Sequence, residues 1–313
     1  MIKVGIAGAD TQLGGELLRL LAHHPEVELV SLFAPSLKGR SVASFHKGLT
    51  GETNVKFSDT LNLENLDVLF LLSGWMPADI TNSEDLKLIS FKRFAGRIQF
   101  PGIDTINFVP GLSEMFRKPL VRGAVAAQIP LPPVSVALIA LYPLASHLLL
   151  NDELEININL PQISKDKYSG EEIKEDLEGF LRDVQLSFQN VKNIEIHTSS
   201  TIRALTVEIT FPCGVSETEI EKLFDDIYDD HNFTHIVHNE PDPVEVSGTQ
   251  KCLIYITKPS EDRLKIKAVA DGILRGGAGD AIHVMNLLFG LFEKTGLNLQ
   301  ASLAFRSNHE NNS

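Results

Sequence analysis

Cysteine is scarce in this chain of 313 residues, which carries only Cys213 and Cys252. Two thiols are too few for a disulfide framework, so the composition predicts a reducing compartment, the cytoplasm. No charged segment followed by an apolar one precedes the first predicted strand, so we expect no leader peptide. The longest apolar run, residues 134–150, contains polar residues and a proline. It therefore predicts a buried helix rather than a membrane span.

Positive charge is also in short supply. Lysine and arginine together number 28 against 41 acidic residues, which gives a formal net charge of −13. A chain this acidic is not expected to bind nucleic acid or an anionic membrane broadly. An anionic ligand would have to meet a local positive site. The length suggests about two domains with ample core, and no internal repeat is present.

What the sequence does have is a glycine-containing turn near its start. An apolar run over residues 3–7 predicts a strand, and the spacing of Leu13, Leu17, Leu20 and Leu21 by three and four predicts one apolar helix face. N–H groups at such a helix start favour a phosphate, as in nucleotide-binding βαβ units. Gly8 and Gly14 take the outer positions of G-x-x-G-x-x-G, and Thr11 takes the middle one. Its Cβ would displace a pyrophosphate or strain the backbone. The candidate cofactor contacts of this turn are Gly8, Ala9, Asp10, Thr11, Gln12 and Leu13. The alternative is a strand–turn–helix that binds nothing.

The segment after the second predicted strand, residues 27–33, bears on which dinucleotide is bound. NAD-selective folds place an acidic residue near this point to bind the ribose 2′-hydroxyl. Here residues 34–40 contain no acid and carry Lys38 and Arg40, with Ser36 beside them. Cations suit a 2′-phosphate, so Ser36, Lys38 and Arg40 favour NADP over NAD. An ordinary solvated basic loop is the alternative.

A continuous apolar run over residues 67–72 predicts a central parallel strand that is buried on both faces. The carboxyl ends of such strands are where an open α/β sheet binds its ligand. Ser73 and Gly74 follow directly, so we include both among the candidate cofactor contacts. Trp75 would either line the groove or pack in the core. Further short strands are predicted at 85–91 and 124–129.

The pattern changes after Asn151, where residues 153–160 alternate between apolar and polar. Alternation of period two predicts a half-exposed strand, and similar strands are predicted within 194–211, 253–256 and 264–270. Helices are predicted at 169–185 and from a capping box at Ser216 through Tyr228. The fold class is therefore α/β, with a Rossmann-type parallel sheet domain and an inserted α+β domain of mostly antiparallel sheet.

A second glycine-rich stretch, residues 272–281, precedes a predicted helix over 282–293. Glycines at a helix start form an anion or amide cradle, so Gly277, Ala278 and Gly279 are candidate cofactor contacts. If this helix folds back on the first domain, both cradles line one groove. We predict a dinucleotide-binding domain of residues 1–150 plus 278–313 and an α+β domain of residues 151–277.

Several segments together resemble the semialdehyde dehydrogenase family, and within it most closely the N-acetyl-gamma-glutamyl-phosphate reductases. The resemblance covers nearly the whole chain and rests on segments 24–27, 36–40, 108–114, 246–252 and 275–291. Aspartate-semialdehyde dehydrogenases are more distantly similar. The resemblance implies NADP as cofactor, a second domain for catalysis and dimerisation, and reduction of an acyl phosphate to an aldehyde through a cysteine thioester, with a histidine as acid/base.

The nucleophile that the resemblance implies is missing. By the resemblance, Pro132 stands at the position of the family's cysteine, and a one-residue slip would place Leu131 or Pro133 there instead; none of the three has a nucleophilic side chain. Residues 160–169, where the catalytic histidine is expected, contain no histidine. Cys252 matches a second, non-nucleophilic cysteine of the family. Cys213 lies far in sequence from the cofactor motifs. Ser135 retains a hydroxyl near the nucleophile position without an evident base. No catalytic residue is therefore assigned.

Arg203 is located where the family holds a substrate-binding arginine, and it could bind a carboxylate or phosphate bidentately. The alternative is a strand arginine paired with a neighbouring acid. Two hypotheses follow. The chain is an NADP-dependent reductase acting on an acyl phosphate or semialdehyde, or it is a catalytically silent paralogue that binds a nucleotide or a partner. Either would form a homodimer by family analogy, and no metal site is predicted.

Overall fold

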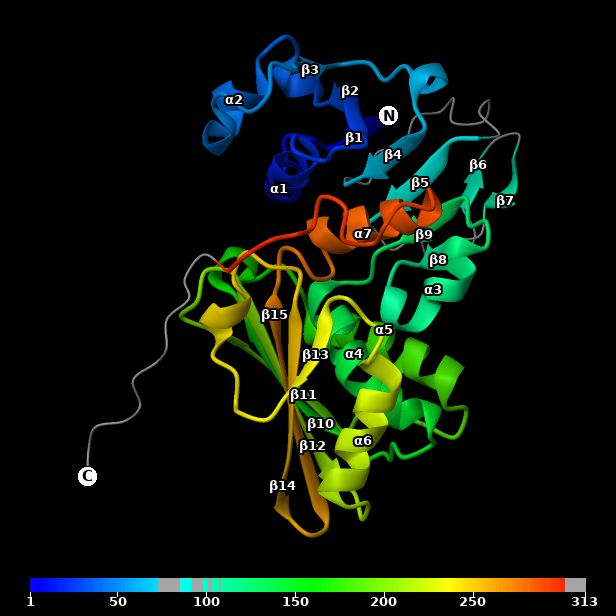
Figure 1. Cartoon of the computed structure of the whole chain (residues 1–313), viewed down its shortest axis with the longest axis vertical. Coiled ribbons are helices and arrows are strands. Elements are labelled where there is room, and N and C mark those ends of the chain that lie inside the picture. Colours follow the sequence, from blue (N-terminus) through cyan, green and yellow to red (C-terminus); the bar gives the residue numbers. More distant parts are fainter. Residues whose placement is uncertain (73–84, 92–97, 101–102, 107, 302–313) are drawn as a thin grey trace. The chain divides into compact units, whose positions relative to one another are not determined.

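The structure is a computed structural model that describes residues 1–72, 85–91, 98–100, 103–106 and 108–301. The chain forms two compact units. Met1–Ser135 together with Gly276–Asn298 makes the first, and Val136–Arg275 together with residues 299–301 makes the described part of the second. The functional division predicted above, at residues 150 and 278, stays a prediction. Each unit is built around its own sheet (Figure 1).

The first unit contains a seven-stranded sheet in the order β3-β2-β1-β4-β5-β9-β8, with every neighbouring pair parallel. The strands are β1 (Ile2–Ala7), β2 (Val27–Phe33), β3 (Phe57–Ser58), β4 (Val68–Leu71), β5 (Lys87–Ser90), β8 (Val109–Pro110) and β9 (Ala126–Gln128). A separate antiparallel pair is formed by β6 (Ile98–Phe100) and β7 (Ile103–Ile106). The predicted Rossmann-type parallel sheet is confirmed.

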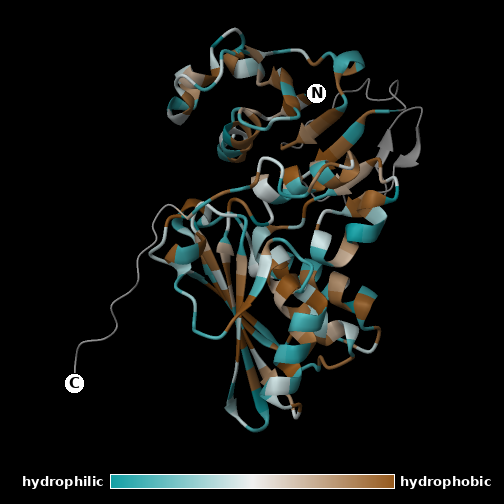
Figure 2. Cartoon of the chain, in the orientation of Figure 1, coloured by the Kyte–Doolittle hydropathy of each residue, from teal (hydrophilic) through white to brown (hydrophobic). Residues whose placement is uncertain are grey.

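The centre of this sheet is buried as the apolar run predicts. All four residues of β4 are buried, and the strand is uniformly hydrophobic in Figure 2. Helix α1 (Gln12–Leu21) buries Leu17, Leu20 and Leu21 of the predicted apolar face and also Leu18, whereas Leu13 is half-buried. The other helices of this unit are α2 (Val42–Phe45), α3 (Ser113–Val121) and α7 (Ala278–Leu288), of which α7 packs against α1, α3 and β5.

The second unit contains a six-stranded sheet in the order β11-β10-β12-β15-β14-β13. The strands are β10 (Glu155–Leu160), β11 (Asn193–Thr198), β12 (Ala204–Pro212), β13 (Thr234–Val237), β14 (Cys252–Ser260) and β15 (Arg263–Asp271). The four inner strands pair antiparallel and the two edge strands pair parallel, so the predicted mostly antiparallel sheet is confirmed. Helices α5 (Gly170–Val184) and α6 (Glu217–Tyr228) lie on one side of it (Figure 1).

Local sequence signals account for these helix starts. Ser169 caps α5 by accepting the Glu172 N–H, and Ser216 with Glu219 forms the predicted capping box of α6. In β10 the apolar residues are buried and the polar ones half-buried, in strict alternation. The predicted half-exposed strand is confirmed for β10, and both helices are confirmed. Within 194–211 the predicted alternation is wrong in part, because β11 has no buried residue and Ala204–Val207 of β12 are all buried.

Two helix boundaries differ from the sequence prediction. Helix α4 (Pro132–Ser146) begins two residues before the predicted start and ends four residues before the predicted end. Proline at the first position explains the early start, because its fixed φ suits a first turn and its missing N–H has no helical partner there. The last helix was predicted at 282–293 and instead runs from Ala278 to Leu288. That prediction was wrong because the glycines were interpreted as a loop. In addition, α7 is buried along its whole length and therefore lacks the apolar period that would mark its ends.

The buried helix α7 carries a polar stripe at a spacing of three residues: Asp280, His283 and Asn286. His283 Nε2 lies 2.8 Å from a Glu293 carboxylate oxygen and its Nδ1 lies 3.2 Å from the Ser113 hydroxyl. Asn286 accepts a 3.0 Å hydrogen bond from His24 Nε2. Buried polar groups are tolerated when each is bonded. The stripe therefore connects α7 to the segment that follows α1, to α3 and to the segment that follows α7.

The Glu293 carboxylate is expected to make the unfolding free energy depend on pH. The hydrogen bond from His283, with the Arg117 guanidinium nearby, lowers the pKa of Glu293 to about 2. This folded pKa lies below the unfolded value of about 4.3. The ionised carboxylate therefore stabilises the fold above the unfolded pKa, and this stabilisation is lost as the pH falls from about 5 towards 2. When the pH is lowered from 7 to 3, the unfolding free energy of the unchanged chain is expected to fall. The fall in the Glu293→Gln variant should be smaller by about 1–2 kcal/mol. Urea unfolding at each pH measures this, with Glu64→Gln as the control for losing one exposed carboxyl. Parallel pH curves for Glu293→Gln and the unchanged chain would contradict it.

Candidate functional site

The turn from β1 into α1 is held by backbone hydrogen bonds. Gly8 adopts a positive φ of 86°, a conformation that favours glycine. The N–H groups of Gly8 and Ala9 both donate to Phe33 O, at 3.1 and 3.3 Å, so the end of β2 fixes the turn. Within the described residues, the N–H of Leu13 in the first turn of α1 has no acceptor. A helix start with an available N–H fits an anionic phosphate.

Thr11 does not strain this turn. Its φ is −90°, an ordinary extended value, and it is the N-cap of α1. Its hydroxyl accepts the Gly14 N–H at 3.0 Å and donates to Gly8 O at 2.9 Å. The predicted strain is therefore wrong, because a threonine suits the N-cap. A Cβ on Gly14 would lie 2.8 Å from Ala9 O, so glycine is required there for the helix to approach the turn.

The basic loop after β2 lies beside this turn. The Ser36 hydroxyl donates a weak 3.4 Å hydrogen bond to the Asp10 carboxylate, so the structure brings the two predicted cofactor segments together. Lys38 forms a 2.7 Å ion pair with Asp59, and this hydrogen bond lowers the pKa of the Asp59 carboxyl. The Arg40 side chain is exposed and has no ion pair within the described part of the chain. Of the two cations, Arg40 is the more available for a ligand.

Other predicted contacts are placed less directly. Ser73, Gly74 and Trp75 lie outside the described residues. Gly277 is the N-cap of α7, and Ala278 and Gly279 belong to its buried first turn. Asp280, which the sequence did not single out, accepts the Gly276 N–H at 2.6 Å through its carboxylate. A carboxylate at a helix start already complements the helix dipole, so this turn suits a neutral amide better than a second phosphate.

Pro132, the residue predicted to stand at the position of the family's cysteine, is buried. Pro132 opens α4, and Gly276, with a φ of +65°, packs so tightly that a Cβ on it would lie 2.4 Å from Pro132 Cα. Ser135 is fully buried and its hydroxyl donates to Pro130 O at 3.3 Å. A hydroxyl that is buried and bonded to a carbonyl is not placed as a nucleophile.

Arg203 in the second unit is engaged by an acid. Its Nε donates to Asp271 Oδ2 at 2.7 Å, and its terminal nitrogen lies 3.4 Å from Oδ1. The fully buried Asp271 also accepts backbone N–H groups, from Gly248 at 2.7 Å and from Ile273 at 2.9 Å. The alternative of an arginine paired with a neighbouring acid is thus present. Substrate binding by Arg203 stays a prediction.

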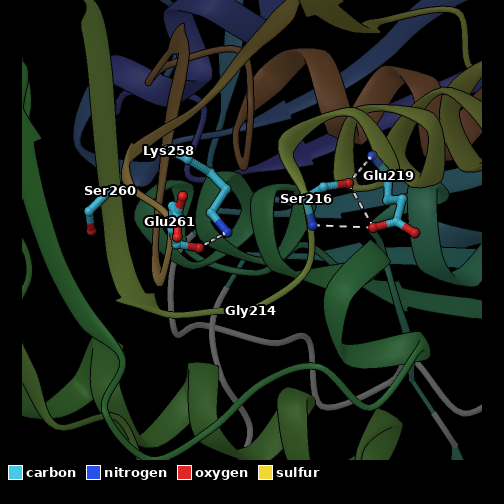
Figure 3. A pocket seen from close by; sticks show the side chains of 6 residues that line it. All are labelled: Gly214, Ser216, Glu219, Lys258, Ser260 and Glu261. Carbon is cyan, nitrogen blue, oxygen red and sulfur yellow. Dashed lines mark hydrogen bonds between the residues drawn. The ribbon is translucent and has the colours of Figure 1, made fainter.

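Neither cysteine is exposed. Cys252 is fully buried in β14, and Cys213 is 7% exposed in the turn before α6. A pocket of about 620 Å³ beside this turn is lined by Gly214, Ser216, Glu219, Lys258, Ser260 and Glu261. Figure 3 shows the Lys258 amine directed at the Glu261 backbone rather than into open space. It also donates to the carbonyls of Cys213 and Val215, so all three of its protons are used within the fold.

Within the described residues, no group of three or more histidine, cysteine, aspartate or glutamate side chains could hold a metal ion. In the same part of the chain, no helix has the length and apolar character needed to span a membrane. A dinucleotide does fit the residues present. The first unit has an available N–H at Leu13 and an exposed arginine, Arg40, on the neighbouring loop. It also has a glycine, Gly14, at which a Cβ would clash with the backbone of the turn.

Comparison with known proteins agrees with this arrangement. Residues 3–84 match the family model "Semialdehyde dehydrogenase, NAD binding domain". Solved structures of aspartate semialdehyde dehydrogenases share the fold. That of Candida albicans with NADP has a TM-score of 0.65 at 14% identity, covering 92% of this chain and 98% of its own. That of Vibrio cholerae, form II, has a TM-score of 0.65 at 11% identity, covering 93% and 98%.

Curated relatives narrow the assignment. N-acetyl-gamma-glutamyl-phosphate reductase of Parabacteroides distasonis is 32% identical over 96% of this chain and 99% of its own length. The reductase of the same name from Phocaeicola vulgatus is also 32% identical, with the same coverage. The chain belongs to the semialdehyde dehydrogenase family, alongside relatives named N-acetyl-gamma-glutamyl-phosphate reductase. The resemblance drawn from its sequence motifs is confirmed.

Proposed function

We propose that this chain binds NADP(H) and acts on an acyl phosphate or the corresponding semialdehyde, as the names of its relatives describe. The observation that carries the proposal is similarity at 32% identity along almost the entire length of both chains, which spans both units. N-acetyl-γ-glutamyl phosphate is accordingly the first substrate class to examine. The assignment of residues 1–150 and 278–313 to cofactor binding and of 151–277 to catalysis and dimerisation belongs to this proposal.

The residues of the first unit would hold the cofactor as follows. The helix-start N–H of Leu13 would donate to the pyrophosphate, and Arg40 with Ser36 would bind the 2′-phosphate. The turn at Gly277–Gly279 would meet the neutral carboxamide of nicotinamide. When bound, the cofactor supplies a hydride. In the second unit, Arg203 would bind a carboxylate or phosphate of the substrate bidentately.

The choice of NADP over NAD has a direct test in Arg40. Arg40→Ala is expected to weaken NADPH binding about 10–100-fold, because it removes a charged hydrogen-bonding partner of the 2′-phosphate. NADH binding is expected to change less than about threefold. Lys38→Ala is the matched variant, and its effect should be smaller because Lys38 is paired with Asp59. Isothermal titration calorimetry measures the binding of NADPH and NADH to the unchanged chain and to both variants. Equal losses for NADPH and NADH, or no NADPH binding at millimolar concentration by the unchanged chain, would contradict the proposal.

A second candidate function is supported by the sequence prediction that Pro132 stands at the family's nucleophile position. Pro132 is buried at the start of α4, and the nearby Ser135 hydroxyl is bonded to a carbonyl. We infer that a thioester is not formed here. The chain would then be a silent paralogue that binds a nucleotide or a partner for a structural or regulatory purpose. Under either function we propose a homodimer in the cytoplasm, without nucleic-acid or membrane partners.

A further inference from the structure

A histidine outside every predicted site contacts the β1–α1 turn. His46 follows α2, and its Nε2 lies 2.8 Å from the Ala9 carbonyl oxygen. A carbonyl oxygen only accepts, so Nε2 carries the proton and donates it. The ring takes the space that a side chain on Gly15 would fill, because a Cβ there would lie 2.6 Å from His46 Nδ1. The His46 ring therefore packs directly against the Gly15 backbone, where there is no space for a larger residue.

The surrounding packing holds the ring in place. Phe45 contacts it edge to face with ring centroids 4.9 Å apart, and the buried Phe57 lies 6.1 Å away. The His46 N–H donates to Val42 O at 2.8 Å, and its carbonyl accepts the Leu49 N–H at 2.9 Å. A side chain fixed at both its ring and its backbone loses little further freedom when it forms a hydrogen bond.

The bond to Ala9 O has a consequence on the other side of the same peptide. In a planar trans peptide, the carbonyl of one residue and the N–H of the next point in opposite directions. Holding Ala9 O therefore fixes the direction of the Asp10 N–H. Within the described residues, the Asp10 N–H has no acceptor. Asp10 also neighbours Ser36 of the basic loop, through their 3.4 Å side-chain contact.

We propose that His46 is a positioning residue for the cofactor: by holding Ala9 O, it orients the Asp10 N–H to donate to the pyrophosphate. This inference rests on the proposed binding of NADP(H) and adds a residue and an atom to it. The role differs from that of Arg40, because His46 acts on the pyrophosphate half of the site and makes no contact with the 2′-phosphate. A ligand without a pyrophosphate separates the two.

Two substitutions separate the hydrogen bond from the packing. His46→Phe keeps an aromatic ring and removes the donor, whereas His46→Gln keeps an amide donor of similar reach. His46→Phe is expected to weaken NADPH binding about five- to tenfold and to leave adenosine 2′-phosphate binding within about twofold. His46→Gln is expected to bind both ligands like the unchanged chain. Gly15→Ala, which displaces the ring while favouring the helix, should behave like His46→Phe.

Isothermal titration calorimetry gives these affinities, and hydrogen exchange without ligand reports on the turn itself. Faster exchange of segment 8–15 in His46→Phe is expected. The proposal is overturned if His46→Phe binds NADPH as the unchanged chain does, or if it loses both ligands equally, which would indicate general damage. If the unchanged chain binds neither ligand, the proposed function fails and the cofactor role of His46 with it. Exchange in segment 8–15 then still decides whether His46 holds the turn.

Discussion

The purified chain is expected to oxidise the γ-semialdehyde of N-acetylglutamate at least about 10⁴-fold more slowly than a family member that carries the nucleophilic cysteine, when phosphate and NADP⁺ are supplied. Loss of a covalent nucleophile costs about 10⁴–10⁶ in serine proteases. Pro132 has no group that could attack an acyl carbon, and Ser135 is buried and bonded to a carbonyl. NADPH formation followed by its absorbance measures the rate.

The remaining thiols provide the control for this result. Any residual turnover should survive iodoacetamide, because Cys252 is fully buried and Cys213 is 7% exposed. Rapid turnover that is abolished by alkylation would contradict this prediction. The Cys213→Ser and Cys252→Ser variants would then show which thiol is responsible. A thioester mass found on either cysteine after incubation with acyl phosphate would do the same. NADPH binding is measured separately, so a slow rate does not count against the cofactor site.

Gly276→Ala is expected to lower the unfolding free energy by about 2–5 kcal/mol, from overpacking and a left-handed backbone. The added Cβ would lie 2.4 Å from Pro132 Cα and 2.6 Å from its nitrogen. Both atoms belong to the backbone at the start of α4, so neither can rotate away. Urea unfolding followed by circular dichroism measures the loss.

Gly290→Ala is the matched control for this substitution. Gly290 has the same φ of +65°, yet a Cβ there would have no heavy atom within 4 Å. It therefore carries the backbone strain alone, about 1–2 kcal/mol. The difference between the two variants isolates the close approach to Pro132. Equal losses would show that the contact at Pro132 costs nothing.

Much of the fold could be predicted from the sequence because local patterns agree with the tertiary structure. The apolar run of β4 indicated a central parallel strand, and the alternation in β10 indicated a half-exposed one. Ser216 and Glu219 announced the start of α6. Such signals lie within a few residues of each other, so spacing alone reveals them.

The remaining features depend on partners distant in sequence. His46 meets Ala9 across 37 positions, and Asp271 meets Arg203 across 68. No spacing rule pairs such residues. Thr11 was misjudged for a related reason, since the glycine pattern suggested strain whereas the chain uses the threonine hydroxyl as a cap. The boundaries of α7 were missed because a helix buried on all sides has no amphipathic period.

The polar stripe of α7 fixes more than the stability of one helix. Asp280, His283 and Asn286 each bond a different neighbour at a different height along the axis. Sliding the helix by one residue, or turning it by a third of a revolution, would separate His283 and Asn286 from these partners and leave both side chains buried without them. The helix can therefore dock in a single alignment only. A helix with leucine at these positions would be more hydrophobic and could pack in several registers. The turn at Gly277 would then lose its fixed orientation.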